Sequence, residues 1–126
     1  AIVRELLIVG AGGFVGAVLR YGVQVAAVGR TGLFPLGTLV VNVVGCFGLG
    51  LLAAWLDERP DLSPELRLAL GTGLFGALTT FSTFGVETLD LWRAGEARLA
   101  LASIFLNLTL GLTAAWFGRS LMTSVA

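Results

Sequence analysis

The residues best suited to chemistry in this sequence are hydroxyl and aromatic side chains that alternate between Gly76 and Gly85. They lie at the end of an uncharged stretch, Leu68 to Val86, which is long enough to cross a membrane. Polar groups at that depth are costly unless they bond one another or face water or a ligand. This segment is therefore the first place to look for function. Its polar and aromatic residues are Thr79, Thr80, Phe81, Ser82, Thr83 and Phe84.

The chemistry that these residues suit is ion contact rather than covalent catalysis. Hydroxyls in helices usually bond a carbonyl one turn back, but four of them in five positions exceed that need and, with Gly76, indicate a local break in the helix. A broken membrane helix exposes carbonyls that suit a cation and N–H groups that suit an anion. Phe81 and Phe84 share a helix face, and their electropositive ring edges suit an anion. The alternative is that both rings only pack or face lipid.

Five further polar residues lie in apolar surroundings. Asn42 is the polar residue in the middle of an uncharged helix, where its amide either joins helices or offers N–H donors to an anion. Ser103 and Asn107 are one helical turn apart, so they either continue a line of donors or bond helix to helix. Glu87 follows the polar segment near a helix end, and Arg20 lies inside a span, where it either reaches the surface or draws anions towards a vestibule.

The elements that must position these residues are membrane-spanning helices. The chain is 56% hydrophobic and 13% charged, about half the charged fraction of a soluble domain. The stretches long enough to cross a hydrocarbon core predict an all-α integral membrane protein, a single four-helix domain over residues 1–126. A cleaved signal peptide is the alternative for the first stretch, although its apolar part is longer than such peptides need. The four stretches are Leu6–Gly29, Thr31–Leu56, Leu68–Val86 and Leu99–Gly118.

The arginines are divided almost evenly between the two ends of the predicted helices. With four spans, the end that carries the N-terminus holds four arginines, the opposite end holds three, and Arg20 lies within a span. Orientation in the membrane follows an excess of basic residues in cytoplasmic loops, and here the excess is a single residue. Either that one residue suffices, or both orientations insert and permit an antiparallel dimer. The first group is Arg4, Arg59, Arg67 and Arg119, and the second is Arg30, Arg93 and Arg98.

Composition also argues against several other functions. The net charge is zero and no basic tail is present, so we expect no nucleic-acid partner. The sequence has no histidine and one cysteine, Cys46, which leaves zinc chemistry almost without ligands. No enzymatic reaction is indicated.

Three segments carry a family resemblance that extends over essentially the whole chain. They are residues 12–21 (GGFVGAVLRY), residues 37–47 (GTLVVNVVGCF) and residues 71–87 (GTGLFGALTTFSTFGVE), of which the third is the most specific. In these segments the chain resembles the Fluc (CrcB) family of small fluoride channels. The resemblance implies an antiparallel, dual-topology homodimer with two fluoride pores, each built from both subunits.

The resemblance also implies roles for individual residues. It implies a structural sodium ion at the dimer centre, held by the main-chain carbonyls of Gly76 and Thr79. The pore residues that it implies are Asn42, Phe81, Phe84, Ser82, Thr83 and, at the end of the polar track, Glu87, with Arg20 near a vestibule. Ser103 and Asn107 depart from the family, in which a tyrosine and a serine stand at these positions, but both still offer hydrogen-bond donors.

The sequence therefore predicts a passive channel that lets cytoplasmic fluoride leave a prokaryotic cell across the plasma membrane. The partners expected are fluoride, a second copy of the chain and the lipid bilayer. Two alternatives remain. A dual-topology multidrug transporter needs a carboxylate deep in the membrane, whereas Glu5 and Glu87 both lie near helix ends. A four-helix scaffold without transport is the other.

Overall fold

The computed structural model describes residues 1–125, in which the regular secondary structure is entirely helical. Four helical spans are long and apolar enough to cross a membrane, as the sequence predicts. The third span is divided into four successive pieces, one of them a π-helix, η1. The elements are α1 (Ile2–Ala27), α2 (Leu36–Asp57), α3 (Pro64–Arg67), η1 (Leu68–Phe75), α4 (Gly76–Leu78), α5 (Phe81–Arg93) and α6 (Ala97–Val125).

The ends of the helices differ from the predicted ends where loop chemistry intervenes. α2 begins at Leu36 rather than at Thr31, because the preceding turn contains Gly29 and Gly32 at positive φ (75° and 63°), a conformation that interrupts a right-handed helix. The third span is longer than its uncharged part, since it already begins at Pro64. The Ser63 hydroxyl accepts a hydrogen bond from the Leu66 amide and caps that start.

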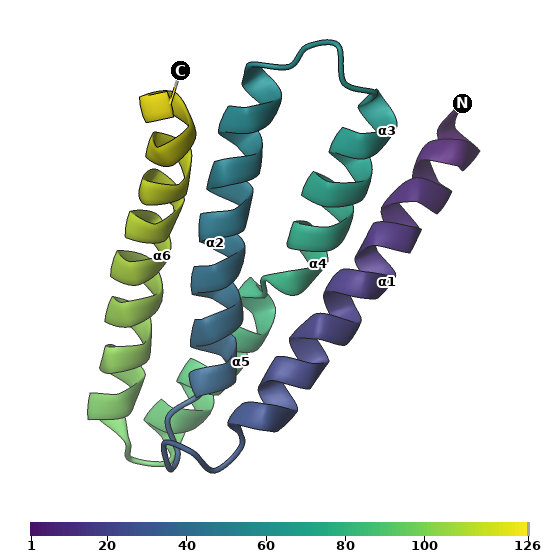
Figure 1. The fold of residues 1–126 in the computed structure, drawn as a ribbon. Coiled ribbons are helices and arrows are strands. Elements are labelled where there is room, and N and C mark those ends of the chain that lie inside the picture. Colours follow the sequence, from purple (N-terminus) through teal and green to yellow (C-terminus); the bar gives the residue numbers. More distant parts are fainter. Residues whose placement is uncertain (126) are drawn as a thin grey trace.

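The four spans run back and forth, so that alternate connections lie at opposite ends of the bundle. Figure 1 shows both termini and the α2–α3 loop at one end, and the α1–α2 and α5–α6 loops at the other. The arginines are therefore divided as the sequence predicts. Four belong to the first end and three to the second.

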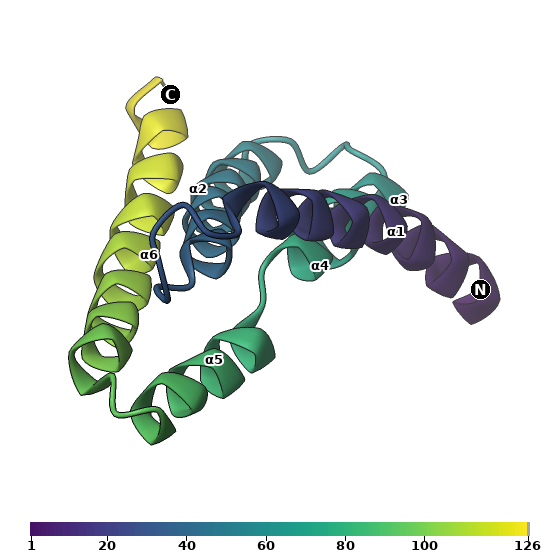
Figure 2. The same ribbon diagram turned by 90° about the horizontal axis from the view of Figure 1, so that it is seen from below.

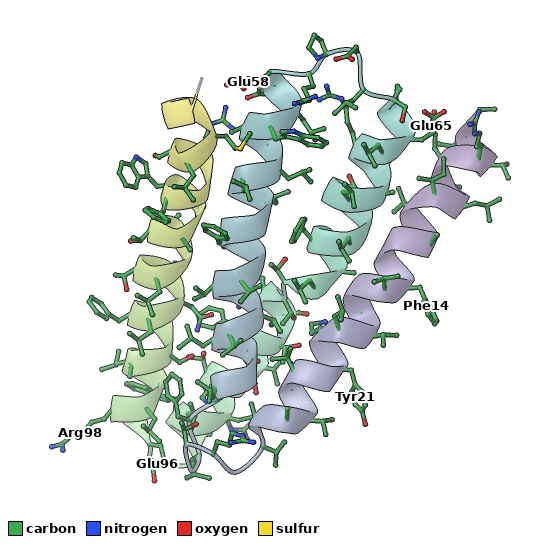
Figure 3. All side chains as sticks on the ribbon, in the orientation of Figure 1. Phe14, Tyr21, Glu58, Glu65, Glu96 and Arg98 are labelled. Atoms are coloured by element: carbon green, nitrogen blue, oxygen red, sulfur yellow. The ribbon has the colours of Figure 1, made fainter. Side chains whose placement is uncertain are left out.

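Small residues bring α1 against the third span. A methyl group placed on Gly12 or on Gly16 would overlap a backbone carbonyl oxygen, that of Ala69 or that of Leu74. These backbones therefore touch without intervening side chains, which is how small residues join membrane helices. The opposite face of α1 is apolar and exposed; Phe14, for example, points away from the bundle (Figure 3).

The third span changes direction between α4 and α5. Thr79 and Thr80 have extended backbone, with ψ of 154° and 110°. Viewed along the bundle, α4 lies beside α1, whereas α5 lies apart from both beyond this extended connection (Figure 2). The segment singled out in the sequence thus contains the point at which the two halves of the span diverge.

Candidate functional site

The extended pair Thr79 and Thr80 forms because two backbone amides bond side chains instead of helical carbonyls. The Thr80 N–H donates to Asn42 Oδ1 at 2.8 Å, rather than to the Gly76 carbonyl one turn back. The Thr83 N–H donates to Thr80 Oγ1 at 3.1 Å, rather than to the Thr79 carbonyl, so Thr80 is the N-cap of α5. As a result, the carbonyls of Gly76 and Thr79 lack the amide partners that a continuous helix would provide.

The hydroxyls of the segment have different surroundings. Thr79 Oγ1 donates to the Phe75 carbonyl at 3.2 Å, a local bond within the span. Thr80 is buried and caps α5, whereas Ser82 is exposed on the first turn of that helix. Two of these hydroxyls therefore shape the backbone, and the Ser82 side chain lies on the exposed face of α5.

Phe81 and Phe84 lie on one face of α5, as their spacing predicts. Their ring centroids are 5.7 Å apart and the ring planes are inclined by 56°. Phe81 is 82% exposed in the single chain. The pair is thus a preformed aromatic surface at the start of α5, next to the extended pair.

Asn42 is the centre of a side-chain network between three helical elements. Its Nδ2 donates to Asn107 Oδ1 at 2.9 Å and to the Thr80 carbonyl at 3.3 Å. Asn107 Nδ2 in turn donates to the Ser103 carbonyl at 2.8 Å. The two α6 residues therefore share a face, as predicted, and they join the network that ends α4.

Arg20 contacts the same, C-terminal end of α4. Its Nε donates to the Ala77 carbonyl at 3.1 Å, and the side chain is half-buried between α1 and α4. A guanidinium at the C-terminal end of a helix satisfies a carbonyl and is favoured by the helix dipole. The Arg20 contact thus adds a positive charge beside the extended pair.

Glu87 belongs to a second polar group, nearer the α1–α2 loop. The expectation that it lies near a helix end is wrong, because α5 continues past the uncharged stretch to Arg93 and Glu87 lies in its middle. Glu87 Oε1 accepts a hydrogen bond from Thr38 Oγ1, and Thr38 Oγ1 accepts one from Gln24 Nε2 at 3.5 Å. These three side chains line a cavity of about 500 Å³ that is formed by α1, α2, α5 and the α1–α2 loop. Sequence reasoning did not single out Gln24 or Thr38, because each is a lone polar residue whose partners are far away in the sequence.

The structure therefore places the predicted residues in two groups. The first surrounds the extended pair, and the second surrounds Glu87. A shallow hollow on α5 is lined by Ser82, Thr83, Val86 and Glu87. Within residues 1–125, no cluster of three or more histidine, cysteine, aspartate or glutamate side chains is placed to hold a metal ion.

Comparison with known proteins identifies the family. Residues 7–119 match the family model described as "CrcB-like protein, Camphor Resistance (CrcB)". The chain belongs to the CrcB family. It is 46% identical to a protein of Shewanella amazonensis over 122 residues, which cover 96% of this chain and 98% of the relative. That relative carries the name fluoride-specific ion channel FluC.

Other CrcB relatives are similar to the same extent. A protein of Shewanella putrefaciens is 45% identical over 121 residues, 95% of this chain and 97% of its own length. One from Shewanella baltica is 44% identical over 122 residues. Both carry the name fluoride-specific ion channel FluC. With its four apolar spans, this CrcB protein is a multi-pass membrane protein.

Proposed function

We propose that this protein is a fluoride-selective, passive ion channel. The observation that carries the proposal is its identity of 46%, over 98% of the relative's length, to a protein named as a fluoride-specific ion channel. The geometry agrees with that activity, since aromatic edges, amides and hydroxyls offer weak polar contacts, with the Arg20 guanidinium beside them. Conduction requires binding that is favourable enough for entry and weak enough for exit.

The proposed path runs along α5 and the facing polar side chains. Fluoride passes the ring edges of Phe81 and Phe84, which carry partial positive charge. The Asn42 amide lies beside this aromatic surface, and fluoride competes with Asn107 for its N–H. The hydroxyls of Ser82 and Thr83 and the amide of Asn107 replace part of the ion's hydration shell, Glu87 marks one end of the track and Arg20 draws anions towards a vestibule. Ser103 is fully buried, so its part in the track is to hold the Asn107 amide through its carbonyl.

A second copy of the chain completes the path in our proposal. Phe81 is 82% exposed and Ser82 is exposed, so one subunit leaves its own aromatic and hydroxyl surface uncovered. In lipid, an exposed hydroxyl finds no water, so it bonds its own helix, a second protein chain or a water-filled path. The near balance of arginines between the two ends supports a partner in the opposite orientation. Such an antiparallel homodimer contains two equivalent pores.

The same dimer offers a site for sodium. The carbonyls of Gly76 and Thr79 lack helical amide partners. The Thr80 N–H, which would bond Gly76, bonds Asn42 Oδ1, and the Thr83 N–H, which would bond Thr79, bonds Thr80 Oγ1. Neutral main-chain oxygens are suitable ligands for a hard monovalent cation, and unwound membrane helices hold sodium in this way. Gly76 is exposed in the single chain, which leaves this turn free to meet a second copy. Sodium bound there would neutralise carbonyl dipoles and hold the two subunits together.

The cellular role follows from passive conduction. In the plasma membrane of a prokaryote, such a channel lets fluoride leave the cytoplasm down its electrochemical gradient. No reaction step and no soluble partner are required.

The test is efflux from proteoliposomes. Vesicles that contain the purified protein and are loaded with fluoride should release it to a fluoride electrode within seconds, whereas matched vesicles loaded with chloride should retain their anion. Protein-free vesicles are the control. Equal release of both anions would refute selectivity, and release of neither would refute the channel.

A pair of substitutions tests the proposed path. Phe81→Ile and Phe84→Ile should lower fluoride efflux at least tenfold, because isoleucine has no polarised ring edge. Phe14→Ile is the matched control, since Phe14 is 71% exposed and points away from the bundle on α1 (Figure 3). If Phe14→Ile lowers efflux as much as the other two, the aromatic surface on α5 is not the path.

A further inference from the structure

A continuous chain of hydrogen bonds links the backbone of α6 to the backbone that ends α4. It begins at the Ser103 carbonyl, which accepts from Asn107 Nδ2 at 2.8 Å. Asn107 Oδ1 accepts from Asn42 Nδ2 at 2.9 Å, and Asn42 Oδ1 accepts from the Thr80 N–H at 2.8 Å. Ser103 is fully buried and Thr80 is 9% exposed, so both ends of the chain are enclosed by protein.

The direction of every bond in this chain is determined by its two backbone ends. A main-chain carbonyl only accepts and a main-chain N–H only donates. The Ser103 carbonyl therefore requires the nitrogen of the Asn107 amide, which turns the Asn107 oxygen towards Asn42. That oxygen requires the nitrogen of the Asn42 amide, which turns the Asn42 oxygen towards the Thr80 N–H. Reversal of either amide would place donor against donor at one joint and acceptor against acceptor at the other.

The distances indicate how much of this orientation depends on Asn107. The Asn42 nitrogen also donates to the Thr80 carbonyl, but at 3.3 Å, beyond the usual range for an N–H···O bond. Its bond to Asn107, at 2.9 Å, lies within that range. Without Asn107, the Asn42 nitrogen would have the weaker of its two acceptors alone.

We propose that Asn107 is a positioning residue: it holds the Asn42 amide in the orientation that captures the Thr80 N–H, and so maintains the end of α4. This role is separate from a donor role for Asn107 in the path. The positioning role goes beyond the proposed function, because it concerns the structure at the end of α4. Of the measurements that test it, only fluoride efflux depends on conduction.

The direct test is hydrogen exchange of the Thr80 amide, resolved by residue with NMR on the ¹⁵N-labelled protein in detergent micelles. Asn107→Leu, which keeps the volume and removes the acceptor, should speed exchange at Thr80 about fivefold, the factor expected for the loss of one hydrogen bond. Exchange at amides in the middle of α2 should stay within about twofold. Thr109→Val is the matched control, because the Thr109 hydroxyl bonds only the Phe105 carbonyl of its own helix.

A double substitution shows whether Asn107 acts through Asn42. In an Asn42→Ala background, Asn107→Leu should no longer change Thr80 exchange, because the link between them is already absent. If Asn107→Leu does not fold, Asn107→Ser serves instead, since its hydroxyl is too short to meet Asn42.

Fluoride efflux then separates this proposal from the others. Faster Thr80 exchange together with reduced efflux supports the positioning role. Reduced efflux with unchanged Thr80 exchange overturns it, and shows that Asn107 acts on the ion directly. Unchanged exchange and unchanged efflux also overturn it. If the wild-type protein conducts no fluoride, the proposed function fails, but the exchange measurements still decide the role of Asn107.

Discussion

Removal of one hydroxyl at Thr80 should loosen the start of α5. Thr80→Val keeps the shape of the side chain but deletes Oγ1, which accepts the Thr83 N–H at 3.1 Å. Loss of an N-cap costs typically about 1 kcal/mol and up to about 2. Thr80 is 9% exposed and lies at membrane depth, where water does not readily replace the bond. We therefore expect the upper half of this range, about 1–2 kcal/mol, and an apparent melting temperature lower by roughly 4–8 °C.

Thermal unfolding in detergent, followed by the fluorescence of the three tryptophans, measures this change. Thr80→Ser retains the cap and should unfold close to wild type. Thr88→Val is the matched control, since it loses only a hydroxyl bond to the Phe84 carbonyl of its own helix. Fluoride efflux should fall in Thr80→Val alone, because Phe81 and Phe84 lie in the capped turn. The reasoning is refuted if Thr88→Val destabilises the protein as much as Thr80→Val, or if Thr80→Ser fails to restore stability.

Three further predictions concern packing, the cation and topology. Gly16→Val should abolish the monodisperse protein peak in size-exclusion chromatography. The valine side chain would overlap the Leu74 carbonyl, at a cost of roughly 3 kcal/mol or more. Gly10→Val is the control and should elute normally, because nothing lies within 4 Å of the added carbon. Replacement of sodium by a bulky organic cation should reduce fluoride efflux and lower the melting temperature, and no change in either would count against the carbonyl site. A Thr31→Cys reporter in a Cys46→Ala background should be labelled by an impermeant reagent for about half of the molecules in intact cells, as mixed insertion requires; labelling of all or none would show a single orientation.

The sequence by itself determined the class of the fold, and it predicted where a candidate site lies. Uncharged stretches of membrane length require spanning helices, because a chain in hydrocarbon must satisfy its backbone internally. The hydroxyls and phenylalanines around Thr79 and Phe81 predicted a candidate site, since polar groups at membrane depth are costly unless they bond one another or face water or a ligand. The spacing of Phe81 and Phe84, and that of Ser103 and Asn107, predicted shared faces because a helix repeats every 3.6 residues.

Tertiary structure decided which backbone groups are released, and by what. Nothing near Thr80 in the sequence shows that its amide bonds Asn42, which lies 38 positions away. The contacts of Thr38 with Glu87 and of Arg20 with the Ala77 carbonyl are equally remote, at 49 and 57 positions. A local pattern reports helix faces, but it does not report which two faces meet. The segment between Gly76 and Gly85 was therefore recognisable from its own residues. The side-chain amide that ends α4 belongs to Asn42 on another helix. Only the packing of α2 against α6 and the third span brings it there.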